Sequence, residues 1–258
     1  MSLNNQNYYT FIDHKTPPIV FIHGVGLDRN MWKPQIDFFK KNSTLTYDLL
    51  GHGKSSFTGE KINIEDYVKQ LDTLTKNLKI DKFHLVGFSI GSLIALNFAS
   101  EFEKKINSLT LISTTYKRNK KQRQEVIDRV NLAKLNKPIS NLALKRWFSD
   151  DYLLKNPNIL KDFIKILNKS SDDQKNFIKA YELFAYYEDK IEKIKKINTR
   201  TLIMTGSNDP GSTPEMSKNL SKDIKNSTYK EINNGKHLCS IECADDVNIS
   251  IKKFIENV

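Results

Sequence analysis

One serine stands between two glycines in the segment HLVGFSIGSLIALNFA, residues 84–99. The pattern is G-x-S-x-G over residues 87–91, with a short apolar run before it and a longer one after it. Between a strand and a helix this pattern is typical of a sharp turn that lifts the serine above a sheet edge, because glycines permit close backbone approach. Ser89 is therefore the candidate nucleophile, and the predicted chemistry is acyl transfer through a covalent intermediate.

A serine hydroxyl needs a base at neutral pH, and the base needs an acid that orients it. The chain has five histidines, at positions 14, 23, 52, 84 and 237. His237, in NNGKHLCSIE, follows the last expected strand, and Asp209, in MTGSNDPGSTP, follows the strand expected before it. Each residue alone could be a surface histidine or a turn aspartate. Together with Ser89 they predict a catalytic triad.

Short apolar segments alternate with helical patterns along the chain. The strand candidates are rich in Val, Ile, Leu and Thr, as buried parallel strands are, and cover residues 18–23, 45–49, 83–88, 109–114, 201–205 and 228–232. The helical patterns cover residues 31–41, 64–78, 90–104, 214–224 and 245–256. This alternation predicts an α/β fold with a mostly parallel central sheet flanked by helices. The triad candidates would then share the edge formed by the carboxyl ends of the strands.

The alternation stops between residues 116 and 198. This stretch of roughly eighty residues is too long for a loop and contains no convincing strand. It carries amphipathic helical patterns over residues 124–135, 139–148, 158–168 and 177–197. We therefore predict a core formed by residues 1–115 and 199–258, with a helical insertion over residues 116–198.

The net charge of +11 raises the alternative of a nucleic-acid partner. The basic residues are scattered and nearly all lysine, and no zinc-finger spacing or RNP-like aromatic motif occurs. The densest run, YKRNKKQRQEVIDR over residues 116–129, is expected to be a solvated face. We therefore expect no nucleic-acid partner.

The sequence also lacks the features that would indicate a membrane-spanning helix, a disulfide framework or a metal site. No apolar run approaches the roughly 20 residues of a membrane-spanning helix, and the first residues do not resemble a secretory signal. Cys239 and Cys243 are too few for a disulfide framework, and with His237 they form an irregular H-x-C-x3-C spacing that is a poor metal site. We expect a soluble cytoplasmic protein without a metal or cofactor.

Five motifs extend the argument beyond the serine turn. They are FIHGVGLDRNMW, YDLLGHGKS, VGFSIGS, TGSNDPGSTPEM and GKHLCSIE. In this order and spacing the chain from Pro18 onward resembles the α/β-hydrolase superfamily. The resemblance implies an eight-stranded type of sheet, with its first strand or two shortened here, and a helical cap over the site. It also implies an oxyanion hole formed by the backbone N–H groups of Val25 and Ile90. Ser92 departs from the family, which usually has glycine there, but its side chain is small.

The insertion carries a narrower resemblance. The segment NLALKRWFSDDYLLKNP, residues 141–157, is similar to the cap of 3-oxoadipate enol-lactone hydrolases. Leu50 departs from that group, which has arginine before GHG, and the residues flanking Ser89 differ from its usual leucine and methionine. The resemblance implies a small ester or lactone substrate that bears a carboxylate. Arg146 is the candidate carboxylate contact, unless it is simply a surface arginine.

The aromatic residues near the site have two readings. Trp147 and Trp32 are candidate substrate contacts, but either could be a packing residue, as could the other cap aromatics. Several other functions remain open, because one fold serves many reactions. The protein could be a general carboxylesterase or thioesterase, a C–C bond hydrolase, a cofactor-free haloperoxidase or a non-catalytic ligand-binding protein.

Overall fold

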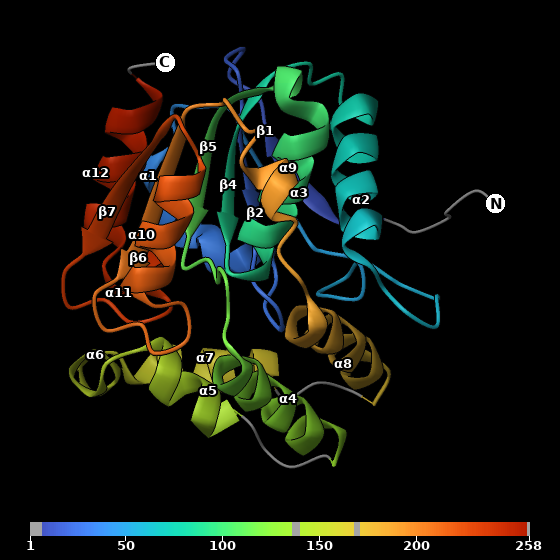
Figure 1. Cartoon of the computed structure of the whole chain (residues 1–258), viewed down its shortest axis with the longest axis vertical. Coiled ribbons are helices and arrows are strands. Elements are labelled where there is room, and N and C mark those ends of the chain that lie inside the picture. Colours follow the sequence, from blue (N-terminus) through green and yellow to red (C-terminus); the bar gives the residue numbers. More distant parts are fainter. Residues whose placement is uncertain (1–6, 136–139, 168–170, 257–258) are drawn as a thin grey trace.

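A seven-stranded sheet forms the centre of the protein in the computed structural model, which describes residues 7–135, 140–167 and 171–256 (Figure 1). The strands are β1 (Tyr9–Ile12), β2 (Ile19–Ile22), β3 (Thr44–Tyr47), β4 (Phe83–Phe88), β5 (Ile106–Ile112), β6 (Thr201–Gly206) and β7 (Ser227–Ile232). Their spatial order is β1-β3-β2-β4-β5-β6-β7, and every pairing is parallel except that of β1 with β3.

The mostly parallel sheet confirms the expected fold class. The described residues contain seven strands, where the family resemblance implied an eight-stranded type of sheet with its first strand or two shortened. The strand β1 was not predicted from the sequence, because its side chains are largely exposed and show no buried pattern. It is an antiparallel edge strand, so it needs neither the apolar run nor the alternation that marks a buried strand.

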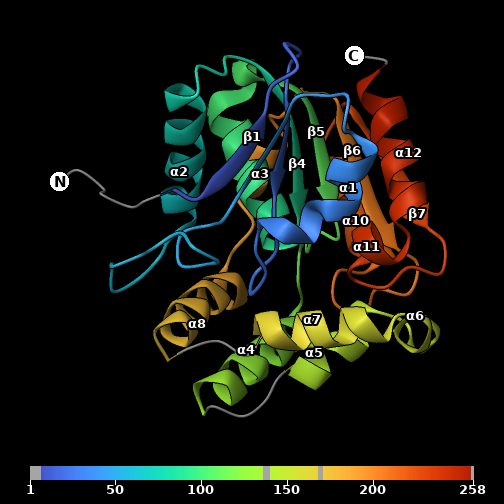
Figure 2. The ribbon, with the colours of Figure 1, turned by 180° about the vertical axis from the view of Figure 1, so that it is seen from behind.

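Helices cover both faces of the sheet (Figure 2). Those of the core are α1 (Lys33–Phe38), α2 (Ile64–Asn77), α3 (Ile90–Phe102), α10 (Pro214–Asp223), α11 (Cys239–Glu242) and α12 (Ala244–Ile255), with short 3-10 helices at Arg29–Trp32 and Glu103–Lys105. In β2, Val20 and Ile22 pack with the cluster of α2 and α3, whereas Ile19 and Phe21 pack with the cluster that contains α12. The two-residue period of the strand therefore builds both halves of the core.

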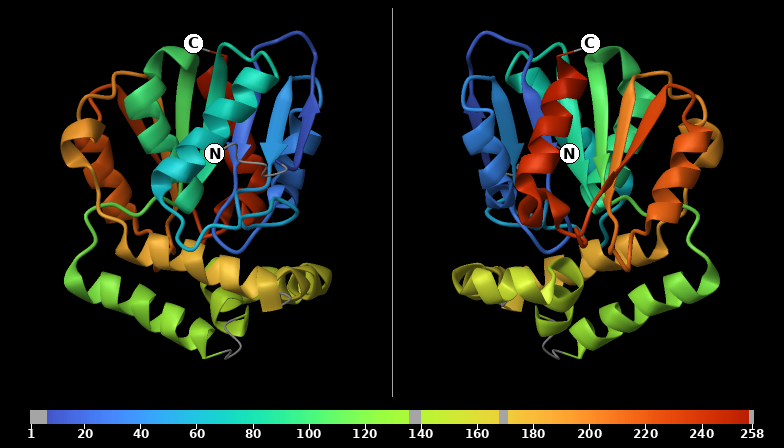
Figure 3. Two further views of the ribbon diagram at one scale, coloured as in Figure 1. Left: turned by 90° about the vertical axis from the view of Figure 1, so that its right-hand side faces the viewer. Right: turned by 90° about the vertical axis from the view of Figure 1, so that its left-hand side faces the viewer.

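All described secondary structure between β5 and β6 is helical, as expected. It comprises α4 (Lys120–Lys134), α5 (Ser140–Trp147), α6 (Asp150–Lys155), α7 (Pro157–Leu167), α8 (Ser171–Tyr186) and α9 (Ile191–Ile194). Positions 139 and 168, at the ends of two expected helices, lie outside the described residues. We call the segment from α4 to α9 the cap. Helices α4 to α8 form a layer across the end of the sheet where the strands finish (Figure 3). In the part of the chain that the structure describes, no helix is long and apolar enough to cross a membrane.

Candidate active site

The strand order creates a crevice beside β2. The chain passes from β2 to β3 on one side of β2 and then returns to place β4 on the other side. At such a switch point the loops after the two central strands diverge, which opens a binding crevice at their carboxyl ends. Val25 follows β2 and Ser89 follows β4, so both lie at this crevice.

Ser89 occupies a strained turn between β4 and α3. Its backbone angles are φ 55° and ψ −117°, a region that side-chain-bearing residues rarely adopt. Its amide donates a hydrogen bond of 2.9 Å to the carbonyl oxygen of Ile112 in β5. The turn holds the Ser89 hydroxyl at the amino end of α3, where the helix dipole favours developing negative charge.

The glycines on either side of Ser89 are required by close backbone contacts. A Cβ atom on Gly91 would collide with the carbonyl oxygen of Ile22 in the neighbouring strand, and one on Gly87 would collide with the carbonyl of Gly91. Ser92 tightens the same turn, because its hydroxyl donates to the carbonyl of Gly87 at 2.6 Å and accepts from the amide of Ile112 at 3.1 Å. The residue expected to be merely tolerated therefore ties the turn to β5.

Gly91→Ala is expected to lower the free energy of unfolding by about 1–3 kcal/mol or more, because the new methyl group meets rigid backbone. Gly211→Ala is the matched control, since its Cβ would meet the end of the flexible Arg146 side chain at 3.2 Å and Oδ1 of Asp209 at an ordinary contact distance of 3.7 Å, and no backbone atom. The control should change the free energy by less than about 0.5 kcal/mol. Urea unfolding measures both, and equal losses would contradict the account of the turn.

Ser89, His237 and Asp209 form one hydrogen-bonded chain. The Nε2 atom of His237 lies 3.3 Å from Oγ of Ser89, and its Nδ1 lies 2.7 Å from Oδ2 of Asp209. All three side chains are buried, although they come from three separate loops after β4, β6 and β7. The geometry allows the imidazole to accept the serine proton while the carboxylate holds the opposite ring nitrogen.

The environment of Asp209 keeps its carboxylate ionised. Burial raises the pKa of Asp209. His237 and the backbone amides of Ser212 and Gly211 lower the pKa by more than burial raises it, so it lies below its ordinary value. Both amides donate to Oδ1 at 2.9 Å. The other oxygen therefore remains available to His237.

Two contacts missed from the sequence fix the loop that carries His237. The hydroxyl of Ser113, at the end of β5, donates to the carbonyl oxygen of His237 at 2.8 Å. The amide of Leu238 donates to the carbonyl oxygen of Trp147 at 3.0 Å, which links this loop to the cap. Neither contact had a sequence signal, because one involves a lone serine and the other only backbone atoms.

The loop after β2 is a tight turn that exposes Val25 to the crevice. The amide of Leu27 donates to the carbonyl of Gly24 at 3.2 Å, and Gly26 has a positive φ of 78°. His23 anchors the turn, because its Nδ1 donates to Gly24 O at 2.8 Å and its Nε2 accepts from the amide of Leu49 at 2.9 Å. Val25 is a central residue of this turn, and Ile90 begins α3, so the intrahelical ladder provides no acceptor for the Ile90 amide.

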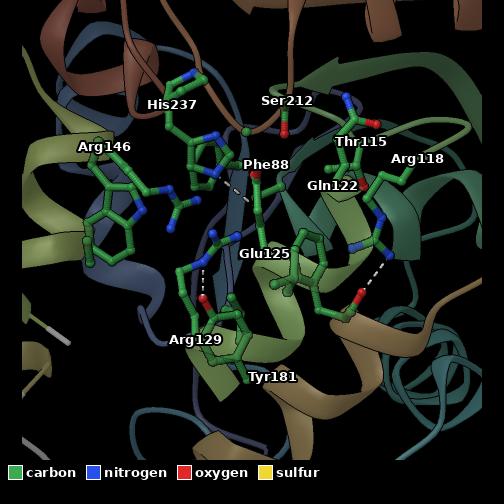
Figure 4. A pocket seen from close by; sticks show the side chains of 18 of the residues that line it. Phe88, Thr115, Arg118, Gln122, Glu125, Arg129, Arg146, Tyr181, Ser212 and His237 are labelled. Carbon is green, nitrogen blue, oxygen red and sulfur yellow. Dashed lines mark hydrogen bonds between the residues drawn. The ribbon is translucent and has the colours of Figure 1, made fainter. Parts of the chain in front are cut away.

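A cavity of about 140 Å³ lies between this crevice and the cap (Figure 4). Core residues and cap residues line it together. The core contributes Val25, Phe88, Ser89, Thr115, Pro210, Gly211, Ser212 and His237. The cap side contributes Arg118, Gln122, Glu125, Val126, Arg129, Ala143, Arg146, Trp147, Leu167, Phe177, Tyr181 and Phe184. The cavity is smaller than the roughly 300–1,000 Å³ of sites for drug-sized ligands.

Two cap arginines approach each other beside the triad (Figure 4). The Nε atom of Arg129 donates to the hydroxyl of Tyr181 at 3.0 Å. Burial, and secondly the charge of Arg129, lower the pKa of Arg146. Neither guanidinium has an ion-pair partner among the described residues. The pair therefore presents positive charge that an anionic ligand would neutralise.

The basic run over residues 116–129 is not simply a solvated face, contrary to expectation. Arg118 precedes α4, and Gln122, Glu125 and Arg129 follow one another at spacings of three and four, so one face of α4 meets the cavity. This spacing was present in the sequence. The face that carries Gln122, Glu125 and Arg129 is polar, however, and a polar face is usually solvated rather than directed into a site.

The predicted substrate contacts have different locations. Arg146 and Trp147 line the cavity, whereas Trp32 does not. Trp32 is fully buried in the core, with its ring centroid 5.0 Å from that of Phe21, so the expectation that it contacts substrate is wrong. Its indole packs against Phe21 of β2 instead. Of the other cap aromatics, Phe177, Tyr181 and Phe184 line the cavity.

His237, Cys239 and Cys243 do not form a metal site. Both ring nitrogens of His237 are engaged by the triad, and Cys239 is buried against Ser113. Among the described residues, no group of three or more His, Cys, Asp or Glu side chains is arranged to hold a metal ion.

The chain matches known proteins over nearly all of its length. It is 27% identical to an (E)-2-((N-methylformamido)methylene)succinate hydrolase of Acinetobacter baylyi, over 98% of this chain and 95% of that protein. It is 29% identical to a 3-oxoadipate enol-lactonase 1 of the same organism, over 94% and 90% of the two chains. The structure of an enol-lactonase from Burkholderia xenovorans superposes with a TM-score of 0.88, covering 98% and 97% of the chains at 24% identity.

A family model described as the alpha/beta hydrolase fold matches residues 17–243. The matched region spans the serine turn, the cap and the loop of His237. It agrees with the strand order, the helical insertion and the hydrogen-bonded Ser-His-Asp chain described above. The chain therefore belongs to the α/β hydrolase fold family.

Proposed function

We propose that this protein is a serine hydrolase that cleaves an ester or lactone bond of a small, carboxylate-bearing substrate. The observation that carries this proposal is the continuous hydrogen-bonded chain from Ser89 through His237 to Asp209, buried at the floor of a cavity. A 3-oxoadipate enol-lactone is the specific substrate that we favour. The relatives at 25–29% identity that are named for this activity support it.

The reaction follows from the arrangement of these groups. Oγ of Ser89 attacks the substrate carbonyl carbon while Nε2 of His237 takes the hydroxyl proton. The tetrahedral intermediate collapses to an acyl-enzyme, and His237 returns the proton to the departing oxygen. Water, deprotonated by His237, then attacks the acyl carbon and releases the acid and free Ser89. Asp209 stays ionised and orients the ring throughout.

The negative oxygen of each tetrahedral intermediate needs donors that are already in place. We assign this role to the backbone N–H groups of Val25 and Ile90, which belong to the loop after β2 and to the first residue of α3. Removing one such donor typically costs about 2.7–4 kcal/mol of barrier. Because both donors are backbone groups, the serine turn and the Gly24–Leu27 turn set their positions.

The active-site nucleophile is tested by covalent labelling. A fluorophosphonate should add one adduct to the wild-type protein, at Ser89, and intact-mass measurement should find none on Ser89→Ala. The wild type should also release p-nitrophenol from p-nitrophenyl acetate. A protein that is inert to both reagents would favour the alternative of a non-catalytic ligand-binding protein.

Substrate panels separate the remaining enzymatic alternatives. The panel contains the enol-lactone derived from muconolactone, short acyl esters, acyl thioesters and vinylogous 1,5-diketones. We expect the highest kcat/KM for the enol-lactone, because Arg129 and Arg146 favour an anionic substrate. A preference for neutral esters, thioesters or diketones would replace this assignment with a general esterase, a thioesterase or a C–C bond hydrolase.

Arg146→Met is expected to lower kcat/KM for an ester that carries a carboxylate, such as p-nitrophenyl hydrogen glutarate, by about 10–100-fold. For neutral p-nitrophenyl acetate the change should be under about threefold, because no charge-assisted hydrogen bond is lost. Lys145→Met is the control, since Lys145 is exposed on the same helix and does not line the cavity. An equal loss on both esters would reassign Arg146 to a structural role.

A further inference from the structure

The loop that carries His237 depends on neighbouring elements for its position. It follows β7, an edge strand that pairs with β6. Asn234 in this loop has a positive φ of 60°, and residues 233–238 contain no helix or strand. Loops of this kind open locally at low cost unless other elements hold them. The place of the His237 ring is therefore set by contacts from outside the loop.

The carboxylate of Glu242 joins this loop to the cap. Its Oε2 accepts from the amide of Lys236, the residue before His237, and its Oε1 accepts from the amide of Ser149, both at 2.8 Å. Glu242 is the last residue of α11 in the core, whereas Ser149 lies between α5 and α6 in the cap. Helix α11 lies at the end of the core that faces the cap (Figure 1). One side chain therefore bonds the backbone of the catalytic loop and the backbone of the cap.

Two further hydrogen bonds cross the same boundary. The amide of Leu238 donates to the carbonyl oxygen of Trp147 at 3.0 Å, and Nζ of Lys236 donates to the carbonyl oxygen of Lys145 at 2.8 Å. Both acceptors belong to the last turn of α5, the helix that also carries Arg146. The end of α5 and the His237 loop are thus joined at several points, and the Glu242 carboxylate accepts one bond from each side.

The charge of Glu242 is directed at backbone groups. Among the described residues Glu242 makes no ion pair, and its two oxygens accept from two N–H groups instead. Hydrogen bonds to an ionised acceptor are roughly twice as strong as those between neutral groups. Glu242 is also half-buried, which strengthens these bonds further. A bridge of this strength suits a joint between a catalytic base and a helix of the substrate cavity.

We propose that Glu242 is a positioning residue, which holds His237 in place for proton transfer and fixes the end of α5, with Arg146 and Trp147, relative to it. This inference rests on the proposed hydrolase function and adds to it a residue that does not line the cavity. Without the bridge, the His237 loop and the end of α5 would shift independently. Displacements of about 1 Å can cost about 100-fold in rate, so the joint matters for catalysis as well as for folding.

Glu242→Ala is expected to lower kcat for p-nitrophenyl acetate by about 10–100-fold and to leave KM within about threefold, because this neutral ester needs His237 but not Arg146. For p-nitrophenyl hydrogen glutarate, KM should also rise by about 10-fold, since α5 carries the proposed carboxylate contact. Glu242→Gln keeps the length and one acceptor oxygen, so its losses should be smaller. An unchanged kcat on both esters would overturn the proposal, and an unchanged KM for the glutarate ester would overturn its claim about α5.

Glu103→Ala is the matched control. Glu103 is also half-buried, and its Oε1 accepts from two backbone amides, those of Asn198 at 2.6 Å and Thr199 at 2.7 Å. These residues precede β6, at the opposite end of the sheet from Ser89. The two variants should lower the urea midpoint alike, but Glu103→Ala should leave kcat and KM unchanged. Equal losses of kcat in the two variants would make Glu242 a structural residue.

Hydrogen exchange tests the joint without requiring hydrolysis. Mass spectrometry follows the exchange of backbone amides in peptides that cover residues 233–238 and 147–152. Both peptides should exchange about 10–100-fold faster in Glu242→Ala than in wild type, and neither should change in Glu103→Ala. Unchanged exchange in both peptides would overturn this inference even in a protein that cleaves esters. Faster exchange in a protein that cleaves no ester or lactone would support the joint and overturn the hydrolase assignment.

Discussion

Ser89→Ala is expected to lower kcat/KM for p-nitrophenyl acetate by about 10,000- to 1,000,000-fold. The hydroxyl is the atom that attacks the carbonyl. No neighbouring group replaces it, because among the described residues Nε2 of His237 hydrogen-bonds Ser89 and neither Thr115 nor Ser212. Losses of this size are typical when a member of a serine-histidine pair is removed. Steady-state release of p-nitrophenol measures the effect.

The pair should behave as one unit. His237→Ala should cost about as much as Ser89→Ala, and the double variant should cost little more than either, because each single change already removes the activated nucleophile. Ser100→Ala is the control, since Ser100 lies near the far end of α3 and its hydroxyl donates to the Asn97 carbonyl. Multiplying losses in the double variant would mean that the two residues act independently.

Asp209→Asn is the second large effect, with an expected fall in kcat of about 10,000-fold. An amide can donate to Nδ1 of His237, which would leave the proton on Nε2 and turn it toward Ser89. The imidazole could then no longer accept the serine proton. Steady-state kinetics at neutral pH checks the result, and a loss below about tenfold would show that Asp209 does not set the histidine tautomer.

The same variant has a pH signature in stability. The folded-state pKa of Asp209 is lowered from 3.8, so its ionised form stabilises the protein above this value, and that contribution is lost as the pH falls below it. The difference in unfolding free energy between wild type and Asp209→Asn should shrink as the pH falls below about 4, where the Asp209 carboxylate becomes protonated. Urea titrations at several pH values measure it. A difference that does not shrink below about pH 4 would contradict a stabilising, ionised Asp209.

The core of the fold was predictable because its signals are local. Buried strands show as short apolar runs, and the expected segments at 83–88 and 201–205 match β4 and β6 within one residue. The serine turn was predictable because any side chain at Gly87 or Gly91 would collide with neighbouring backbone, so the turn requires glycine at both positions. The exposed edge strand β1 was not, since nothing buries its side chains and so nothing constrains their pattern.

The candidate site was only partly predictable. His237 lies 148 residues from Ser89, and the sequence placed both at one sheet edge through strand order alone. The distances that join them depend on contacts such as that of Ser113 with the His237 carbonyl, which have no local signal. Trp32 was misassigned because an aromatic residue near a catalytic loop has the same sequence pattern whether it faces substrate or core.

By itself the sequence determined the strands, the turn of Ser89 and the order of the three triad residues, because each depends on the chemistry of a few neighbouring positions. Only the tertiary structure decided which face of α4 meets the cavity and which arginines lie there without counterions. A polar face has the same appearance in sequence whether water or a substrate neutralises it. That choice is made by the packing of the cap against the sheet, among residues far apart in the chain.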